Sequence, residues 1–136
     1  MKNELPDLIN EKTSVVIGAA IKVHRALGPG LFESAYEICL VYELRRAGLD
    51  IATGQAVPIH YEGVTLATGY RLDIVVNQTI VVELKSVSAL APIHTAQVIT
   101  YLKLTGLPVG LLINFNVTIL KNGIKRLLNP NTTRTR

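Results

Sequence analysis

The sequence predicts an α/β sandwich in which helices cover both faces of a mixed sheet. Apolar residues recur at helical spacing in the N-terminal third, and they follow strand patterns between residues 49 and 85. A further helical stretch and a strongly apolar strand come next. Because the order is helix, helix, three antiparallel strands, helix, strand, the sheet acquires helices on both faces.

Two helices are predicted in the N-terminal third. The first spans residues 13–27, with Thr13 or Ser14 as its cap, and the second spans about residues 31–47. The stripe expected on one face of the second helix consists of Leu31, Ala35, Ile38, Tyr42 and Arg45.

Strand patterns fill the middle of the chain. Turn signals at Thr53-Gly54, Glu62-Gly63 and Asn77 divide residues 49–85 into a predicted three-stranded antiparallel meander. Pro58 lacks an amide hydrogen, so its strand is expected to lie at an edge or to begin there.

The C-terminal part predicts one more helix and one more strand. The helix spans about residues 92–105, with a proline in its first turn. Residues 109–115 are apolar without alternation, which is typical of a strand buried on both faces. A short turn is expected at Asn122-Gly123.

Length and composition limit the kinds of protein that this sequence can encode. The 136 residues, 49% of them hydrophobic, predict one domain over residues 1–128, with a flexible tail over 129–136. The polar N-terminus is not a secretory signal, and no apolar run reaches the roughly 18–20 residues of a membrane span. The single cysteine, Cys39, allows no internal disulfide. We expect a cytoplasmic protein.

The chain is mildly basic, with a net charge of +4. This charge suits a nucleic-acid partner, but a solvated basic C-terminal end explains it as well. The cations at that end are Lys121, Lys125, Arg126, Arg134 and Arg136.

Three charged residues stand in two otherwise apolar strands, in the stretch YRLDIVVNQTIVVELKS. If the turn at Asn77 has two residues, Asp73 and Glu83 point to opposite faces of the sheet. If it has three, Asp73 lies opposite Glu83, and period 2 places Lys85 beside Glu83. Hydrophobicity does not choose between the registers; the three-residue turn gathers the charges.

Two opposed carboxylates repel each other, and a divalent cation between them removes that penalty. Mg²⁺ accepts one or two carboxylates together with waters and phosphate oxygens. The adjacent Lys85 can position an attacking water or neutralise charge on a scissile phosphate. The alternative is that Asp73 and Glu83 sit at strand ends and form surface ion pairs with Lys85 or Arg71.

The same residues resemble the PD-(D/E)XK nuclease superfamily: Asp73 in GYRLDIVV, then Glu83-x-Lys85 in VVELKS. More narrowly, Gly30-Leu31-Phe32-Glu33-Ser34-Ala35-Tyr36 resembles the signature of the small GxxExxY proteins within that superfamily. IKVHRALGPGLFESAYE, PIHTAQVITYLKLTGLPVGLLINFN and LKNGIKR are similar to that family too. The resemblance covers about residues 13–128. It implies a restriction-endonuclease-like three-layer α/β/α sandwich and a metal-dependent nuclease.

The resemblance also implies roles for individual residues. Asp73 and Glu83 match the metal ligands, and Lys85 matches the catalytic lysine. Glu33 matches an extra acidic position beside the metal. On the helix after the catalytic strand, a Gln-x-x-x-Tyr pattern is matched by Gln97 and Tyr101. The proline of the superfamily's name is absent, because Leu72 precedes Asp73.

Each supporting residue has a plainer interpretation. Glu33 lies in the first turn of its helix, where a carboxylate is favoured by the helix dipole. Tyr36 either hydrogen-bonds the site or packs. Gln97 and Tyr101 share a helix face, with His94 one turn earlier, and fit a half-exposed polar stripe.

Three functions fit these residues. The first is a Mg²⁺- or Mn²⁺-dependent nuclease acting on DNA or RNA, which the residues do not distinguish. The second is a catalytically silent nuclease fold that binds nucleic acid or assembles with other proteins. The third is a small-molecule or phosphatase-type metal hydrolase. A homodimer or a partner subunit would supply a specificity element that so short a chain has little room for.

Overall fold

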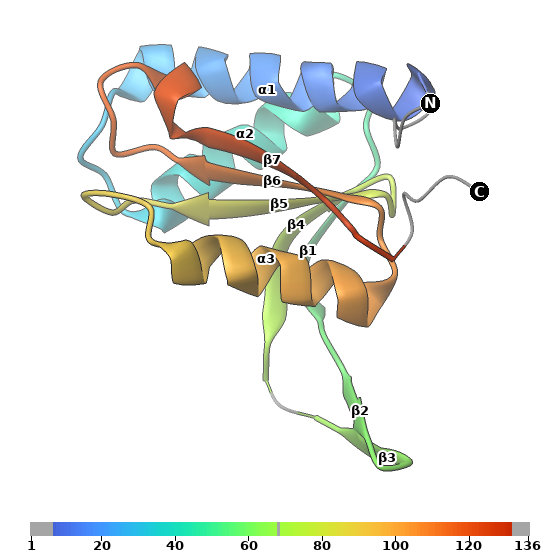
Figure 1. The fold of residues 1–136 in the computed structure, drawn as a ribbon. Helices are drawn as coiled ribbons and strands as arrows, with labels where there is room; N and C mark the ends of the chain where they lie inside the picture. The colour runs from blue at the N-terminus through green and yellow to red at the C-terminus, as the bar shows by residue number, and fades with distance from the viewer. Residues whose placement is uncertain (1–6, 68, 132–136) are drawn as a thin grey trace.

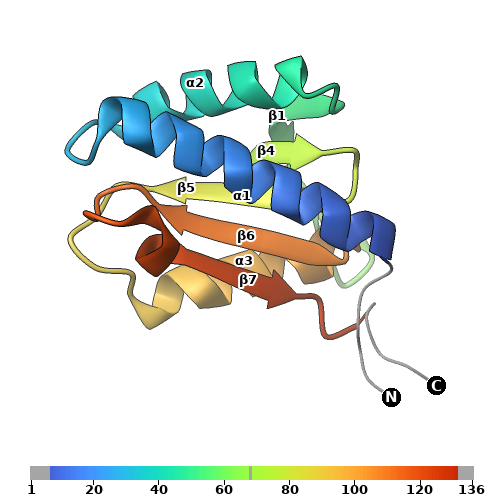
Figure 2. The same ribbon diagram turned by 90° about the horizontal axis from the view of Figure 1, so that it is seen from above.

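Three layers build the protein in the computed structural model, which describes residues 7–67 and 69–131. Helices α1 (Asp7–Leu27) and α2 (Glu33–Arg46) lie side by side on one face of a sheet, and α3 (Pro92–Thr105) covers the other face (Figures 1 and 2). The predicted α/β/α sandwich is confirmed, and the third helix has the predicted bounds.

The central sheet has five strands in the order β1-β4-β5-β6-β7. Only the pair β5–β6 is parallel, so the sheet is mixed, as predicted. Apolar side chains of the inner strands pack against α1 and α2 on one face and against α3 on the other. The strands are β1 (Ile51–Ala56), β4 (Arg71–Val76), β5 (Ile80–Lys85), β6 (Val109–Asn114) and β7 (Ile124–Leu128).

The edge strand β7 was not predicted. It follows a short 3₁₀ helix, η1 (Leu120–Gly123), and pairs antiparallel with β6. Two of its five residues, Lys125 and Arg126, are exposed cations. Charged side chains on an edge strand discourage pairing with other chains, and they also mask the strand pattern in the sequence.

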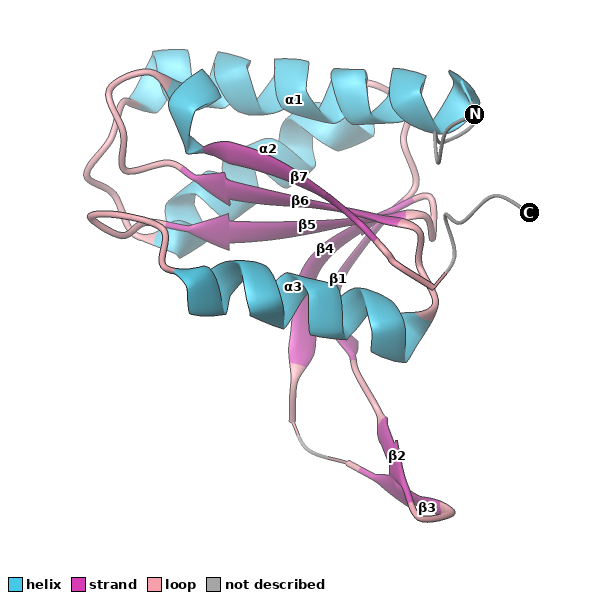
Figure 3. Cartoon of the chain, viewed as in Figure 1, coloured by secondary structure: helices cyan, strands magenta, loops and turns pink. Residues whose placement is uncertain are grey.

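The expected meander is interrupted by a separate hairpin. β1 pairs directly with β4, and the Thr53-Gly54 turn signal lies inside β1, so the prediction of a turn there was wrong. Between them, β2 (Ile59–Tyr61) and β3 (Val64–Leu66) form a two-stranded sheet that projects beyond the body of the molecule (Figure 3). The Glu62-Gly63 signal marks its turn.

The start of the first helix and the start of the predicted tail differ from expectation. α1 begins at Asp7, and the hydroxyl of Thr13 donates to the Ile9 and Asn10 carbonyls, so this residue is not the cap. The predicted tail begins at Asn129, yet that side chain is fully buried and its amide donates to the Leu102 carbonyl at 2.8 Å. Residues 132–136 of the tail lie outside the described residues.

The face that α2 buries is not the predicted stripe. Tyr36, Leu40 and Leu44 are fully buried, whereas Ile38 and Tyr42 are 71% and 60% exposed. The Tyr36 ring stacks on Phe115 with centroids 4.4 Å apart, and this contact fixes the rotation of the helix. An apolar and aromatic ridge of α2 therefore faces solvent.

In the described part of the chain, no helix is long and apolar enough to span a membrane.

Candidate active site

The β4–β5 hairpin adopts the register that gathers the charges. Val76 pairs with Ile80 and Ile74 pairs with Val82, so the turn has three residues. Asn77 and Gln78 adopt left-handed conformations, with φ of 51° and 48°. Of the two alternatives, this is the three-residue turn that gathers the charges, and it places Asp73 opposite Glu83.

The ladder between β4 and β5 ends at Ile74–Val82, one pair before these acids. Beyond it the two strands diverge, and β4 turns away from β5 with β1 beside it (Figure 1). Carboxylates replace the missing ladder bonds: Asp73 Oδ2 accepts the Leu84 N–H at 2.9 Å, and Glu83 Oε1 accepts the Asp73 N–H at 3.4 Å. We call this place the fork.

The other edge of Asp73 is unpaired as well. β1 pairs with β4 at Thr53–Ile74 and at Gln55–Leu72, but Gly54, which stands opposite Asp73, is skipped. Gly54 has a φ of 63°, a conformation that a residue with a Cβ adopts only with strain. Asp73 itself is thus left out of both ladders, although its neighbours Ile74 and Leu72 remain paired with β1.

Burial and mutual repulsion act on both acids of the fork. Glu83 is only 6% exposed. Burial, and after it the Asp73 charge, raises the pKa of Glu83 to about 8. Burial likewise raises the pKa of Asp73, although the Leu84 N–H opposes that shift. A positive charge next to this pair would therefore stabilise the deprotonated form of both acids.

Lys85, the last residue of β5, supplies part of that charge. Its neighbours Val82 and Leu84 pack toward α1 and α2, so period 2 sends Glu83 and Lys85 to the α3 side. The Lys85 charge lowers the pKa of both acids without reversing either rise. Among the described residues, neither acid forms an ion pair within 4.0 Å with Lys85 or Arg71. The surface ion-pair interpretation is therefore wrong.

Two acids of α2 face the fork. The charge of Glu33, exposed in the first turn, raises the pKa values of Asp73, Glu83 and Glu37. Glu37, one turn on, was not singled out from the sequence. Burial raises its pKa most, followed by the charge of Asp73. The signal that points to Glu37 is its i+4 spacing from Glu33.

Tyr36 ties the second helix to the loop before it. Its hydroxyl donates to the Gly28 carbonyl at 2.6 Å and accepts the Leu31 N–H at 3.1 Å. The Leu31 carbonyl in turn accepts the Ser86 hydroxyl at 2.6 Å. Through this chain of bonds, the loop that leads into Glu33 is attached to the residue after Lys85.

Buried Asn114, at the end of β6, holds the same segment from the other side. Its Oδ1 accepts the Val87 N–H and its Nδ2 donates to the Val87 carbonyl. Sequence reasoning missed this residue, because an asparagine at a strand end gives no distinguishing pattern. A buried asparagine with both ends of its amide satisfied fixes the loop firmly.

On the α3 side, Gln97 and Tyr101 line a cavity of about 350 Å³ with Tyr70 and Ile59 at the base of the β2–β3 hairpin. Tyr101 is 6% exposed, so it is not part of a half-exposed stripe. Burial and then the Glu83 charge raise the pKa of its phenol, so the two side chains lie within electrostatic reach of each other. His94 accepts the Ala91 N–H on its ring and caps α3.

The model of the PD-(D/E)XK nuclease superfamily matches residues 10–127. The chain belongs to this superfamily, and its sandwich is a restriction-endonuclease-like fold. It therefore carries a nuclease-like domain, a fold that indicates interaction with nucleic acid. Comparison with curated proteins found no match, and neither did comparison with solved structures.

Nucleases of this superfamily generally use divalent metals. The described residues contain no cluster of three or more His, Cys, Asp or Glu side chains with metal-holding geometry, so Glu33 does not complete one with the fork acids. The donor set of the fork still fits Mg²⁺, which binds through one or two carboxylates and keeps several waters. Asp73 and Glu83 each accept a backbone N–H on one carboxylate oxygen.

Proposed function

We propose that this protein is a metal-dependent nuclease that hydrolyses phosphodiester bonds in nucleic acid. Asp73 and Glu83 would hold Mg²⁺ or Mn²⁺ at the fork, with Glu33 as a further acid beside it. When bound, such an ion polarises the phosphate and stabilises charge that develops during hydrolysis. The observation that carries the proposal is the buried, mutually repelling acid pair at the end of the β4–β5 ladder.

The side chains around the pair complete the proposed machinery. Lys85 would orient the attacking water and neutralise charge on the scissile phosphate. The water oxygen forms a new P–O bond as the P–O bond to the leaving oxygen breaks, and the proton that the water loses is balanced by the one that the leaving oxygen gains. Gln97 of α3, which lines one cavity with Tyr101, would contact the reacting groups, and Tyr101 would support it one turn later. Tyr36 is a positioning residue, since its hydroxyl holds the loop before Glu33.

Within the superfamily, we place the protein in the GxxExxY group. In this chain the glycine, the acid and the tyrosine of the motif stand in the loop before α2 and in its first turn. Gly30 has a φ of 99°, Glu33 begins α2, and Tyr36 fastens the loop. The motif would thus present the extra acid to the fork.

A cleavage assay tests the proposal. Purified protein is incubated with single-stranded DNA, duplex DNA and RNA, with Mg²⁺, with Mn²⁺ and with EDTA. We expect metal-dependent cleavage of at least one substrate, lowered by about 10²- to 10⁴-fold in Lys85→Ala. Asp73→Asn should abolish it, because an amide is a poor ligand for a hard cation.

Lys103→Ala is the matched control, since it removes an exposed lysine in the last turn of α3. We expect wild-type cleavage from this variant. Circular dichroism should show that all the variants remain folded. Cleavage that survives in Asp73→Asn would contradict the proposal. Salt-dependent binding without any metal-dependent turnover would identify a silent nuclease-fold module instead.

A further inference from the structure

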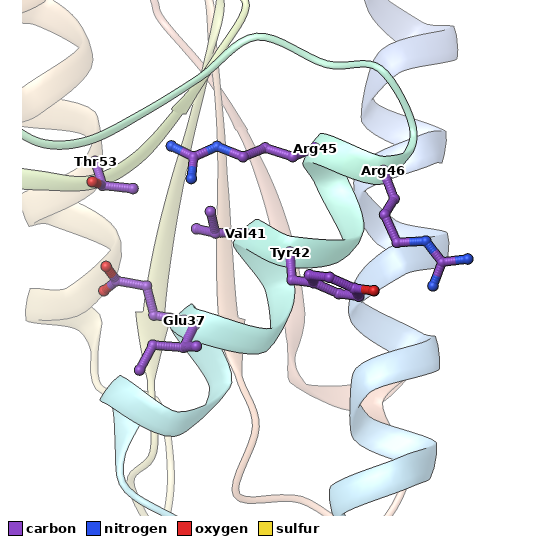
Figure 4. A pocket seen from close by; sticks show the side chains of 7 residues that line it. Glu37, Val41, Tyr42, Arg45, Arg46 and Thr53 are labelled. Carbon is purple, nitrogen blue, oxygen red and sulfur yellow. The ribbon is translucent and has the colours of Figure 1, made fainter.

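A groove runs along the exposed side of α2 beside the edge strand β1. Its volume is about 590 Å³. Six of its lining residues come from α2 and one, Thr53, from β1. Arg45 and Glu37 reach from the helix toward Thr53, and Tyr42 and Arg46 lie on the side of the helix that faces α1 (Figure 4).

One end of the groove adjoins the fork. Thr53 pairs with Ile74, the residue directly after Asp73. Glu37, at the same end of α2, lies within the electrostatic reach of Asp73 and Glu33. This end of the groove, at Thr53 and Glu37, therefore lies next to Asp73 on the α2 side of the sheet.

The far end of the groove combines cations with an aromatic ring. Arg45 and Arg46 are exposed, and the Arg46 guanidinium lies over the Tyr42 ring, 5.5 Å from its centroid. The ring is 60% exposed and Ile38, one turn before it, is 71% exposed. From Glu37 to Arg45 the helix rises by about 12 Å, since each residue adds about 1.5 Å.

We propose that this groove binds a single-stranded segment of nucleic acid next to the scissile phosphate, with a phosphate on Arg45 and a base stacked on Tyr42. The inference rests on the proposed nuclease function and names its substrate class. Arginine pairs with phosphate through two parallel hydrogen bonds, and bases stack on exposed aromatic rings regardless of their sequence.

Duplex nucleic acid fits these features poorly. In a duplex the bases are stacked on each other, so none is available to an aromatic ring on the protein. Recognition of a duplex backbone instead relies on many cations spread over a broad face. Among the described residues, the groove offers only two guanidiniums, which lie on opposite sides of α2, and one aromatic ring (Figure 4). This composition matches a strand with unstacked bases.

Fluorescence anisotropy in EDTA, with labelled single-stranded DNA and RNA oligonucleotides, tests the inference. We expect Arg45→Ala to weaken binding at least about tenfold, the usual size of a lost charge-assisted hydrogen bond. It should also reduce the slope of log affinity against log salt by about 0.7, the value for one phosphate contact on a single strand. A duplex of the same sequence should bind more weakly.

Tyr42→Ala should weaken binding roughly five- to hundredfold, the range for losing one base–aromatic stack. Tyr42→Phe keeps the ring and should bind within about twofold of wild type, which separates stacking from any contact of the hydroxyl. Lys103→Ala removes one exposed cation on the opposite face of the sheet and should also bind like wild type.

Wild-type protein that binds no single strand would overturn the inference. So would unchanged affinity in both Arg45→Ala and Tyr42→Ala, or an equal loss in Lys103→Ala. The proposed function fails separately: cleavage that survives in Asp73→Asn leaves the anisotropy results intact. Likewise, if the groove does not bind a single strand, the metal dependence of cleavage is unaffected.

Discussion

Strand β5 has two neighbours in the sheet, and it is held by them in different ways. With β6 it pairs in parallel along all six residues, from Ile80–Val109 to Lys85–Asn114. With β4 it pairs over only three residues, and the ladder stops where the acids begin. The edge of β5 that pairs with β6 is thus held rigidly. At the edge toward β4, the strands separate and leave room for the charged side chains.

This difference explains how an apolar strand carries charge. On the closed edge, Glu83 lies beside Leu112, and buried Asn114 fastens the segment after Lys85. On the open edge, the N–H groups of Asp73 and Leu84 donate to the two carboxylates instead of to a strand ladder. A site on a strand fixed along one whole edge keeps its geometry better than a site on a loop.

The largest expected change in stability comes from placing a carboxylate at position 82, one residue before Glu83. Val82 is fully buried and faces the core under α1 and α2. We expect Val82→Asp to lower the free energy of unfolding by about 3–5 kcal/mol, because that carboxylate has no partner. In urea denaturation at pH 7, Glu83→Gln should stay within about 1 kcal/mol of wild type, since a glutamine resembles the protonated acid. A similar loss of unfolding free energy in both variants would contradict this difference between the two positions.

The next effect is a pH dependence of stability. The pKa of Glu83 is about 8 in the folded protein and 4.5 in its reference state. Between these values the folded state binds more protons than the unfolded state, so stability falls as pH rises. The stabilisation is fully present below pH 4.5 and is lost as pH approaches 8.

Urea denaturation at a series of pH values measures this dependence. Glu83→Gln should flatten the profile, although Asp73, whose pKa is also raised, leaves a smaller slope. Mg²⁺ should add more stability at pH 8 than at pH 6, because it binds the deprotonated acids. A wild-type profile that rises over this range would exclude a buried, protonated Glu83.

The smallest effect concerns the β1 side of the fork. Gly54→Ala places a Cβ in a left-handed conformation and should lower stability by about 1–2 kcal/mol. Gly18→Ala lies in α1 with no atom within 4 Å of the new Cβ, and should raise stability by up to about 1 kcal/mol. Thermal denaturation of both variants gives the comparison. Equal signs would show that the strain at Gly54 is unimportant.

Part of this architecture was predictable because its signals are local. The number of residues in the turn at Asn77 decides which side chains of β4 and β5 share a face. The sequence reduced this to two registers, and the structure has the one that a shared site for the three charges requires. The core of α3 and the apolar run of β6 are equally plain in the sequence. Glu33 was predicted in the first turn of α2, where the structure has it.

Other parts depended on contacts that no local pattern records. The rotation of α2 is set by the Tyr36–Phe115 stack, which joins residues far apart in the chain. The Thr53-Gly54 pair looks like a turn, but pairing with β4 draws it into a strand. The groove beside α2 and the position of Glu37 near Asp73 depend on these same tertiary contacts.

Isothermal titration calorimetry of Mg²⁺ and Mn²⁺ into the protein tests the central claim, that the fork is a divalent-metal site. We expect wild-type protein to bind at least one of the ions near pH 8, with proton release that grows as pH falls toward 6. Asp73→Asn should lose this binding, and Lys103→Ala should keep it. Wild-type protein that binds neither ion, or Asp73→Asn that binds as tightly as wild type, would contradict the account.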